Sequence, residues 1–284
     1  MVFHKPPTTF IEKVILKVAD LQKMTRYYEE VIGFTLLKKQ ENAVSLTADG
    51  ETILLELKQL EHVESKASQT AGLYHFALLL PARTDLANIV RHFIDGDIRF
   101  GAGDHLVSEA LYLSDPEGNG IEIYVDRPSV DWNWQDDEVQ MTTEQVDFEN
   151  LLTESPGKGW QGLPAQTVMG HLHLQVSEIA VNERFYMEGI GFQLANRYGN
   201  QALFVSDNKY HHHLAFNTWA GLGIPNATNH MTGIEAYTII FPDEAARKKT
   251  IEQLQALSIT VEKVDDTYIT HDPSNIRVEL DVYK

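Results

Sequence analysis

The sequence predicts an α+β fold assembled from four copies of one strand-helix-strand-strand-strand module. Alternating apolar strands, each followed by a helical pattern, recur at intervals of roughly 50 to 60 residues, and such self-similarity indicates a repeat architecture. In addition, Glu122 and Glu279 each follow an Asp-Pro turn by the same interval. At 284 residues the chain is long enough to bury a substantial core in one large or two ordinary domains.

The first module is expected at about residues 8–60. Its opening strand alternates from Phe10 to Val18, and the apolar residues that follow recur at helical spacing up to Gly33, where glycine suits a left-handed helix end. Turn residues such as Asp49 and Gly50 separate the remaining strands. These three strands are predicted at 34–39, 43–47 and 52–57.

The second module, at about 71–127, repeats this order. Its strand, helix and two closing strands are predicted at 73–80, 82–95, 110–113 and 120–125. The turn from Asp115 to Gly120 is dense in residues that form tight turns.

The third and fourth modules are expected at about 167–220 and 231–284. The third begins with a strand at 170–176, continues through a helix that ends near Gly189, and closes at 211–216. The fourth has a strand at 234–241, a helix at 243–257 and a closing strand that ends at Glu279.

The modules form two halves, 1–130 and 167–284, joined by a connecting strap at 131–166. The strap exceeds an ordinary turn in length, so it is either a tether or a functional flap. Trp132 and Trp134 are expected to fasten it to the first half. The apolar residues Phe148, Leu151 and Leu152 predict a short helix within it.

Three segments carry a family resemblance: Gly72–Pro81, Asp104–Pro116 and Tyr210–His213. They resemble the vicinal oxygen chelate superfamily, which includes glyoxalase I, bleomycin-resistance proteins and type I extradiol dioxygenases, and most of all its four-module, catechol 2,3-dioxygenase-like branch. The resemblance covers nearly the whole chain. It implies that modules pair into two open, barrel-like mixed sheets with helices outside, and that metal ligands come from the first and last strands of each module.

Matching the modules gives the candidate ligand positions. First strands offer Lys13, His75, His171 and Ala236, and last strands offer Glu56, Glu122, His213 and Glu279. Each open, barrel-like sheet forms a cup whose concave side faces the ligands. We expect modules 2 and 3 to form one cup and modules 1 and 4 the other, rather than consecutive modules to pair. This pairing concentrates imidazole and carboxylate groups in one cup, whereas a cup with a lysine and an alanine at ligand positions holds a metal ion poorly.

The resemblance implies that His75, Glu122 and His171 bind a divalent metal, Fe(II) foremost, with Mn(II), Zn(II) and Ni(II) as alternatives. A lone strand histidine is more often a packed core residue than a ligand, but recurrence at matching places in two modules favours ligation. Two imidazoles and one carboxylate occupy one face of an octahedral metal and leave the other positions to substrate and dioxygen.

The resemblance also implies catalytic residues. Tyr112, ten residues before Glu122, fits the active-site tyrosine of the family. Because neighbouring strand residues face opposite sides, either His212 or the pair His211 and His213 points inward. Matching to extradiol enzymes makes His212 the acid-base residue, whereas matching to glyoxalases makes His213 a fourth ligand. His173 and His105 are expected to line the cup.

Three functions fit this pattern. The foremost is an extradiol-type dioxygenase, in which a catechol-like vicinal diol chelates Fe(II), dioxygen binds beside it and the ring opens next to the diol. A glyoxalase-type isomerase or lyase usually uses four ligands. A small-molecule-binding protein for resistance or sequestration needs the cup but no tuned metal.

Composition limits the partners. With 23 basic and 41 acidic residues the net charge is −18, which repels nucleic acid and anionic membranes. No run of about twenty apolar residues predicts a membrane span. The absence of cysteine excludes disulfides and thiolate ligands. The start of the sequence lacks the apolar core of a signal peptide, so a cytoplasmic monomer or homodimer acting on a small molecule and O2 is expected.

Overall fold

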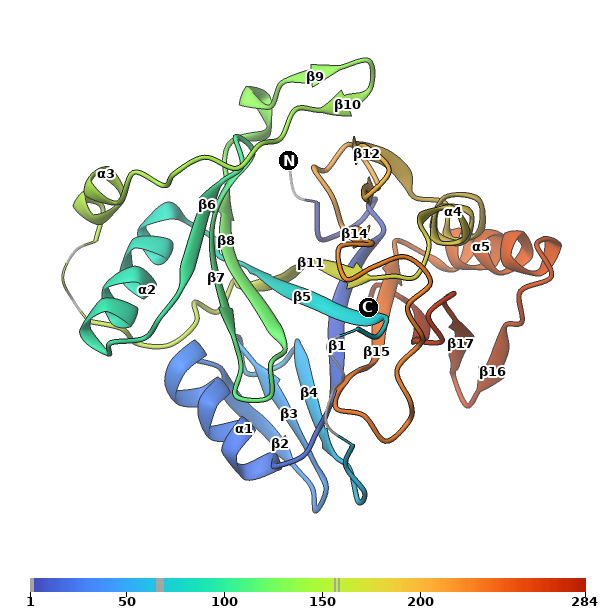
Figure 1. The fold of residues 1–284 in the computed structure, drawn as a ribbon, viewed down its shortest axis with the longest axis horizontal. Helices are drawn as coiled ribbons and strands as arrows, with labels where there is room; N and C mark the ends of the chain where they lie inside the picture. The colour runs from blue at the N-terminus through green and yellow to red at the C-terminus, as the bar shows by residue number, and fades with distance from the viewer. Residues whose placement is uncertain (1–2, 65–68, 156, 158) are drawn as a thin grey trace.

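The computed structural model describes residues 3–64, 69–155, 157 and 159–284, which form two eight-stranded mixed sheets with helices outside (Figure 1). Module 1 contains β1 (Phe10–Val18), α1 (Leu21–Tyr27), the π-helical turn η1 (Tyr28–Ile32), β2 (Thr35–Lys39), β3 (Ala43–Thr47) and β4 (Leu55–Gln59). Module 2 contains β5 (Gly72–Leu79), α2 (Arg83–Asp95), β6 (Gly101–Asp104), β7 (Ser108–Ser114) and β8 (Gly120–Asp126).

The second half repeats this order. Module 3 contains β11 (Val168–Gln175), α4 (Ile179–Glu183), the π-helical turn η3 (Arg184–Ile190), β12 (Gln193–Tyr198), β13 (Ala202–Ser206) and β14 (Leu214–Asn217). Module 4 contains β15 (Gly233–Phe241), α5 (Glu244–Ala256), β16 (Glu262–Val264), β17 (Thr267–His271) and β18 (Arg277–Val282). Together these elements confirm the predicted α+β class and four-module order.

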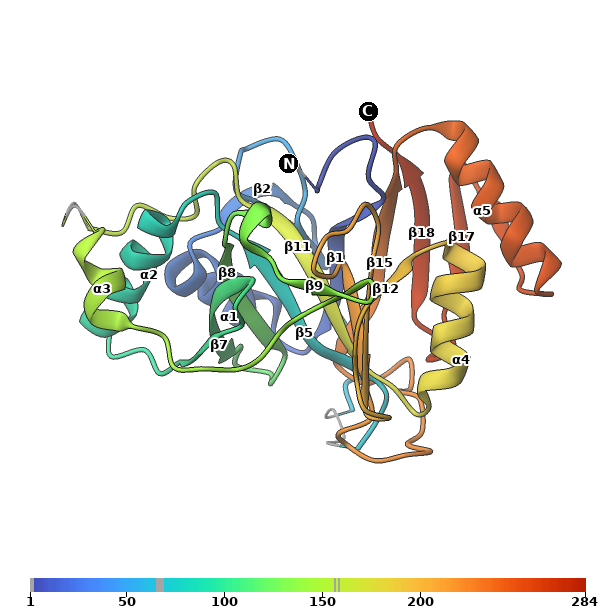
Figure 2. The same ribbon diagram turned by 90° about the horizontal axis from the view of Figure 1, so that it is seen from above.

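The sheet order confirms the expected pairing of modules. One sheet runs β12-β13-β14-β11-β5-β8-β7-β6 and joins modules 3 and 2, whereas the other runs β16-β17-β18-β15-β1-β4-β3-β2 and joins modules 4 and 1. In each sheet the first strands of two modules meet as an antiparallel pair, β5 with β11 and β1 with β15. Figure 2 shows the two sheets from above, with α2 and α5 at opposite ends of the molecule.

The helix ends follow local sequence rules. Asp20 and Asp243 cap α1 and α5 by accepting hydrogen bonds from backbone N–H groups three residues on. Gly33 has φ +92°, as expected for a left-handed end. In module 3 the corresponding glycine is Gly191 rather than Gly189. Gly189 instead lets α5 approach, because a Cβ there would lie 2.8 Å from the Leu254 side chain.

The strap bridges the two edges of the sheet formed by modules 2 and 3. A 3-10 turn, η2 (Ser129–Asp131), leads into it, and it contains the hairpin of β9 (Trp134–Gln135) and β10 (Glu138–Val139) and the predicted short helix, α3 (Phe148–Thr153). Glu144 exchanges two backbone hydrogen bonds with Asp104 on β6, and Asn196 on β12 donates to the Val139 carbonyl. The strap is therefore fastened to both halves, not to the first half alone.

Trp132 also connects the strap to both halves of the chain. It is buried against Phe3 and Tyr210, and its indole N–H donates to the Arg127 carbonyl.

Among the residues that the structure describes, no helix has the length and apolar character of a membrane span.

Candidate metal centre

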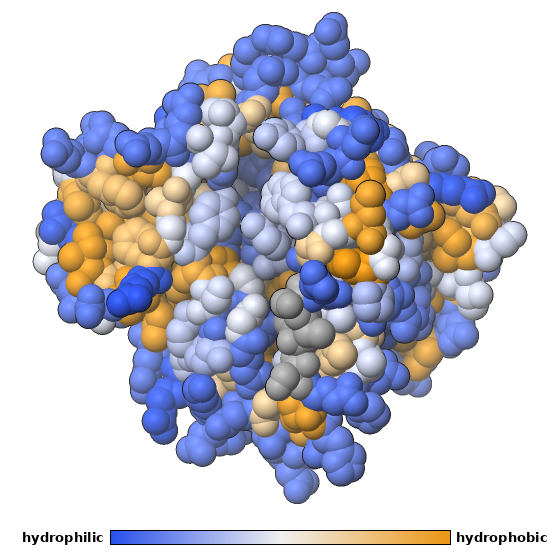
Figure 3. All heavy atoms as spheres, in the orientation of Figure 1, coloured by the Kyte–Doolittle hydropathy of each residue, from blue (hydrophilic) through white to orange (hydrophobic). Residues whose placement is uncertain are grey.

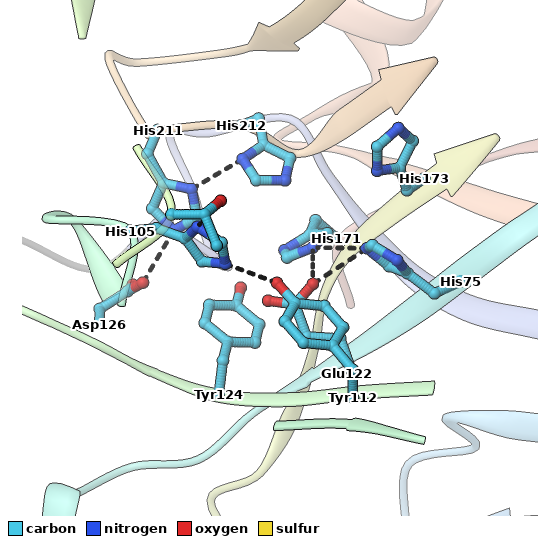
Figure 4. Close-up of polar contacts among 12 residues, drawn as sticks. His75, His105, Tyr112, Glu122, Tyr124, Asp126, His171, His173, His211 and His212 are labelled. Carbon is cyan, nitrogen blue, oxygen red and sulfur yellow. Dashed lines mark hydrogen bonds and ion pairs between the residues drawn. The ribbon is translucent and has the colours of Figure 1, made fainter. Parts of the chain in front are cut away.

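Three side chains from three strands of one sheet converge on a point in the cup (Figure 4). His75 lies on β5, His171 on β11 and Glu122 on β8. The Nε2 atoms of His75 and His171 lie 3.0 and 3.1 Å from Glu122 Oε2 and 3.4 Å from each other. All three residues are buried.

This triangle fits a divalent metal. Ligand bonds of about 2.1 Å at right angles place neighbouring ligand atoms about 3.0 Å apart. The three measured separations of 3.0, 3.1 and 3.4 Å are close to that value, so the three atoms match one face of an octahedron. Two imidazole nitrogens and one carboxylate oxygen are also a donor set that Fe(II), Mn(II) and Zn(II) accept.

Electrostatics hold these ligands in their binding forms. Burial lowers the pKa of His171 to about 4, although the nearby Glu122 carboxylate opposes the shift, so the ring is neutral at pH 7. Burial alone would raise the pKa of Glu122, but His171 and His75 outweigh it and hold that pKa well below its usual range. A neutral imidazole and an ionised carboxylate are what a metal ion requires.

The strand register explains why the sheet brings three candidate ligands together and not four. Ala77, two residues beyond His75, pairs with Glu122 across the parallel strands β5 and β8. In module 3 the equivalent of Ala77 is His173, two residues beyond His171, and it pairs with Ala215 across β11 and β14. The fourth ligand position therefore holds an alanine.

His213 does not occupy the fourth position that the glyoxalase match assigned to it. His213 lies two residues before Ala215, which holds the ligand position, and its ring points out of the cup toward Phe3. The Nε2 atom lies 3.0 Å from the Phe3 carbonyl, and the Nδ1 atom accepts from the Asp207 backbone N–H. Both ring nitrogens are thus engaged by backbone, which leaves His213 neither a ligand nor a catalytic group.

His212 is the member of the histidine triplet that faces the cup. Its ring lies 4.0 Å from that of His171, measured between centroids. Behind it, His211 Nδ1 lies 2.8 Å from His212 Nδ1, and His211 Nε2 lies 2.8 Å from Asp126 Oδ1. This Asp126–His211–His212 chain was not predicted from the sequence, because Asp126 lies on β8, 85 residues before His211, and adjacent strand residues are expected to face opposite sides.

The chain fixes the proton on each ring. The Asp126 carboxylate accepts from His211 Nε2–H, and we assign His212 Nδ1–H as the donor to His211 Nδ1. The Nε2 lone pair of His212 is then directed into the cup (Figure 4). Burial, followed by the neighbouring histidines, holds the pKa of His212 well below its usual value, so this lone pair is free at pH 7.

Tyr112 stands beside the ligands, as expected from its spacing. It pairs directly with Glu122 across the β7–β8 hairpin, so the two side chains share one face. Its hydroxyl lies 2.6 Å from His105 Nε2, and His105 Nδ1 lies 2.7 Å from the Thr142 carbonyl in the strap. Burial and Glu122 raise the pKa of Tyr112 well above its usual value, so it remains a phenol.

The cup opens into a cavity of about 760 Å³ that is bordered by both modules and the strap. Its inner end holds His75, Glu122, Tyr112 and His212. An aromatic wall, defined as Tyr74, His173, Phe204 and Trp219, leads outward from there. Met141, Thr142 and Thr143 of the strap also line the cavity, so the strap is both a tether and part of the site.

The second cup holds an ion-pair cluster in place of a metal triad. Glu279 pairs with Thr238 across β18 and β15, the same register as Glu122 with Ala77. Lys13 Nζ lies 2.9 Å from Glu279 Oε2, and Arg277 lies 3.2 Å from Oε1. The ammonium and guanidinium groups supply the positive charge that the carboxylate requires.

The sequence of this chain is similar to those of known proteins. The profile of the Glyoxalase/Bleomycin resistance protein/Dioxygenase superfamily matches residues 11–123. A protein of Bacillus subtilis (strain 168) named catechol-2,3-dioxygenase is 38% identical over 268 residues, which cover 93% of this chain and 94% of that protein.

Solved structures agree with the fold. A Bacillus subtilis structure provisionally described as a dioxygenase has a TM-score of 0.65 at 12% identity, covering 97% of this chain and 85% of that one. Glyoxalase I from Zea mays has a TM-score of 0.57 at 14% identity, covering 96% and 92% of the two chains. The chain belongs to the glyoxalase/bleomycin resistance/dioxygenase superfamily, as its four modules and the sequence resemblance indicated.

Proposed function

We propose that this protein is an extradiol-type dioxygenase that cleaves the ring of a catechol-like diol with O2. The observation that carries the proposal is the alanine at the fourth ligand position, because three protein ligands leave room on a metal for both a chelating diol and dioxygen. A glyoxalase-type isomerase, which usually uses four ligands, is disfavoured by the same alanine.

His75, Glu122 and His171 would hold the metal, for which Fe(II) is the proposed identity. When bound, the metal would supply Lewis acidity toward the diol and redox chemistry toward dioxygen. Side chains of the protein would carry out the proton transfer and hold the substrate in position.

His212 would act as the general base. Its Nε2 lone pair faces the cup and would accept the proton of a diol hydroxyl, while Asp126 and His211 hold the ring in the required tautomer. Tyr112 would orient the second hydroxyl. Because His105 Nδ1–H donates to the Thr142 carbonyl, His105 Nε2 accepts a hydrogen bond from the Tyr112 hydroxyl, and the Tyr112 oxygen is left to accept a hydrogen bond from substrate.

The test is metal loading followed by oxygen uptake. Protein loaded anaerobically with Fe(II) should consume O2 when catechol is added, with a ring-opened product. His75→Ala, Glu122→Ala and His171→Ala should abolish stoichiometric metal binding, whereas Glu279→Ala in the second cup should retain it. Activity on a thiol adduct without any oxygen uptake across a panel of diols would refute the proposal.

A further inference from the structure

The cavity beyond the ligands has two chemically different parts. Its inner end is rich in proton donors and acceptors, but its outer wall is aromatic. Tyr74 and Trp219 lie 5.3 Å apart between ring centroids, His173 lies 5.5 Å from Trp219, and Phe204 lies 5.8 Å from His173. The wall is thus continuous from the metal ligands to the surface, where Trp219 is 47% exposed.

The cavity is also larger than the reacting ring requires. A volume of about 760 Å³ falls within the range of roughly 300 to 1,000 Å³ that accommodates drug-sized ligands. A diol held at the inner end would therefore leave space along the aromatic wall for a substituent on its ring.

Among the described residues that line this cavity, none is a lysine or an arginine. The arginines nearest along the chain already have carboxylate partners: Arg127 pairs with Asp104, and Arg197 pairs with Glu183. In Figure 3 the centre of this face is hollowed and bordered largely by pale residues of intermediate hydropathy. Within the part of the chain that the structure describes, the cavity therefore offers no cationic side chain to an anionic substituent.

The histidines of the cavity do not replace that missing charge. Asn217 Oδ1 accepts from the Trp219 backbone N–H, so its amide nitrogen donates to His173 Nε2, and that nitrogen has no hydrogen to offer a substrate anion. His105 uses both ring nitrogens on Thr142 and Tyr112. A substrate carboxylate would lose its hydration here without gaining an ion-pair partner among the described lining residues, and it would approach a chain of net charge −18.

We propose that the substrate is a catechol with an uncharged apolar substituent, alkyl or aryl, that packs on the aromatic wall, and that catechols with a carboxylate are rejected. Trp219 is the residue that sets this preference, because it presents the largest aromatic face at the outer end of the wall. The inference rests on the proposed function for the position of the diol.

The experiment measures binding without turnover. Protein loaded with Zn(II) is titrated calorimetrically with catechol, 4-isopropylcatechol and 3,4-dihydroxybenzoate, the last two having substituents of similar size but different charge. We expect the isopropyl compound to bind about 10-fold more tightly than catechol, and the carboxylate compound at least about 10-fold more weakly. Equal or tighter binding of the carboxylate compound would overturn the inference.

Two variants assign the preference to the wall. Trp219→Ala should reduce the isopropyl-to-catechol affinity ratio to less than about 3. Tyr283→Ala removes an aromatic ring that is exposed to the same 47% but lies beside the second cup, and it should keep the ratio of the parent protein. A ratio that is unchanged in Trp219→Ala would contradict the role of the wall.

The outcome is separable from that of the proposed function. If the Fe(II) protein consumes O2 with catechol but prefers the carboxylate compound, only the substrate class is wrong. If the affinity order holds but no diol supports oxygen uptake, ring cleavage is wrong and the binding specificity stands. Absence of binding by any diol would refute both.

Discussion

Acid should destabilise the metal-free protein through His171. Burial holds the pKa of this ring at about 4 in the folded chain, against 6.5 for an ordinary histidine. Above pH 6.5 the ring is neutral in both states and contributes no pH dependence. As the pH falls from 6.5 to 4 the unfolded chain binds a proton that the folded chain does not, so stability is lost across this window.

The magnitude follows from these two values. At pH 5 the linkage relation gives a loss of about 2 kcal/mol for this one ring, whereas at pH 7.5 the loss is less than about 0.1 kcal/mol. A His171→Gln variant cannot take up the proton. Its unfolding free energy should therefore fall by about 2 kcal/mol less than that of the parent protein between pH 7.5 and pH 5.

The assay is urea unfolding at both pH values with a chelator present, followed by tryptophan fluorescence. Other buried histidines are common to both proteins, so the difference between the two losses reports His171 together with its effect on the neighbouring Glu122 carboxyl. His62→Gln serves as the control, because its exposed ring is solvated in both states. If parent and His171→Gln lose the same free energy on acidification, the desolvation argument for the metal centre is wrong.

Three further predictions concern the two cups. Gly120→Ala removes no ligand, but its Cβ would overlap the Tyr74 carbonyl next to His75, so it should weaken metal binding about 10- to 100-fold in a chelator competition. Gly101→Ala is the control and should bind metal as the parent protein does, because its Cβ meets only ordinary van der Waals contacts. Asp126→Asn should lower kcat with catechol about 10-fold or more at unchanged metal content, because His211 is then free to adopt the wrong tautomer. An unchanged kcat would exclude a role for the Asp126–His211–His212 chain. Glu279→Gln breaks the ion pair with Lys13, so it should lower the unfolding free energy by about 1 to 2 kcal/mol and leave the metal stoichiometry unchanged. Loss of one equivalent of metal would place the ion in the second cup.

Turn chemistry explains which parts of the site the sequence predicted. Glu122 and Glu279 each follow an Asp-Pro turn, and the observed registers of Ala77 with Glu122 and Thr238 with Glu279 show that both were aligned correctly. The turn fixes the register because its hydrogen bonds set where the following strand begins. Asp115, for example, accepts from the backbone N–H groups of Glu117 and Asn119.

Module 3 lacks that turn, and there the alignment of His213 was displaced by two residues. The histidine triplet lies before β14, in an irregular segment whose side chains do not alternate as strand residues do. Without a turn motif, nothing local shows that Ala215 and not His213 lies opposite His173. The same irregular segment allows His211 and His212 to contact each other instead of facing opposite sides.

The strap limited prediction in a different way. Its short helix follows from local apolar spacing, but the contact of Thr142 with His105 depends on where the strap crosses the sheet edge. That crossing is fixed by the backbone pair of Glu144 with Asp104, which joins residues 40 positions apart in sequence. Side-chain patterns within one element contain no information about such a contact.

The two cups show how one register can serve two purposes. In both, a carboxylate on a last strand faces residues on the paired first strands, and burial makes an uncompensated negative charge costly. Lys13 and Arg277 neutralise Glu279 from within the chain, so the second cup is complete without a ligand. Around Glu122 the compensating groups are two histidines, and His171 is neutral at pH 7, so that cup is the one whose charge balance a divalent cation would improve. The difference between the two cups therefore rests on whether the first strand offers the carboxylate a permanent cation, as Lys13 does, or an imidazole, as His75 and His171 do.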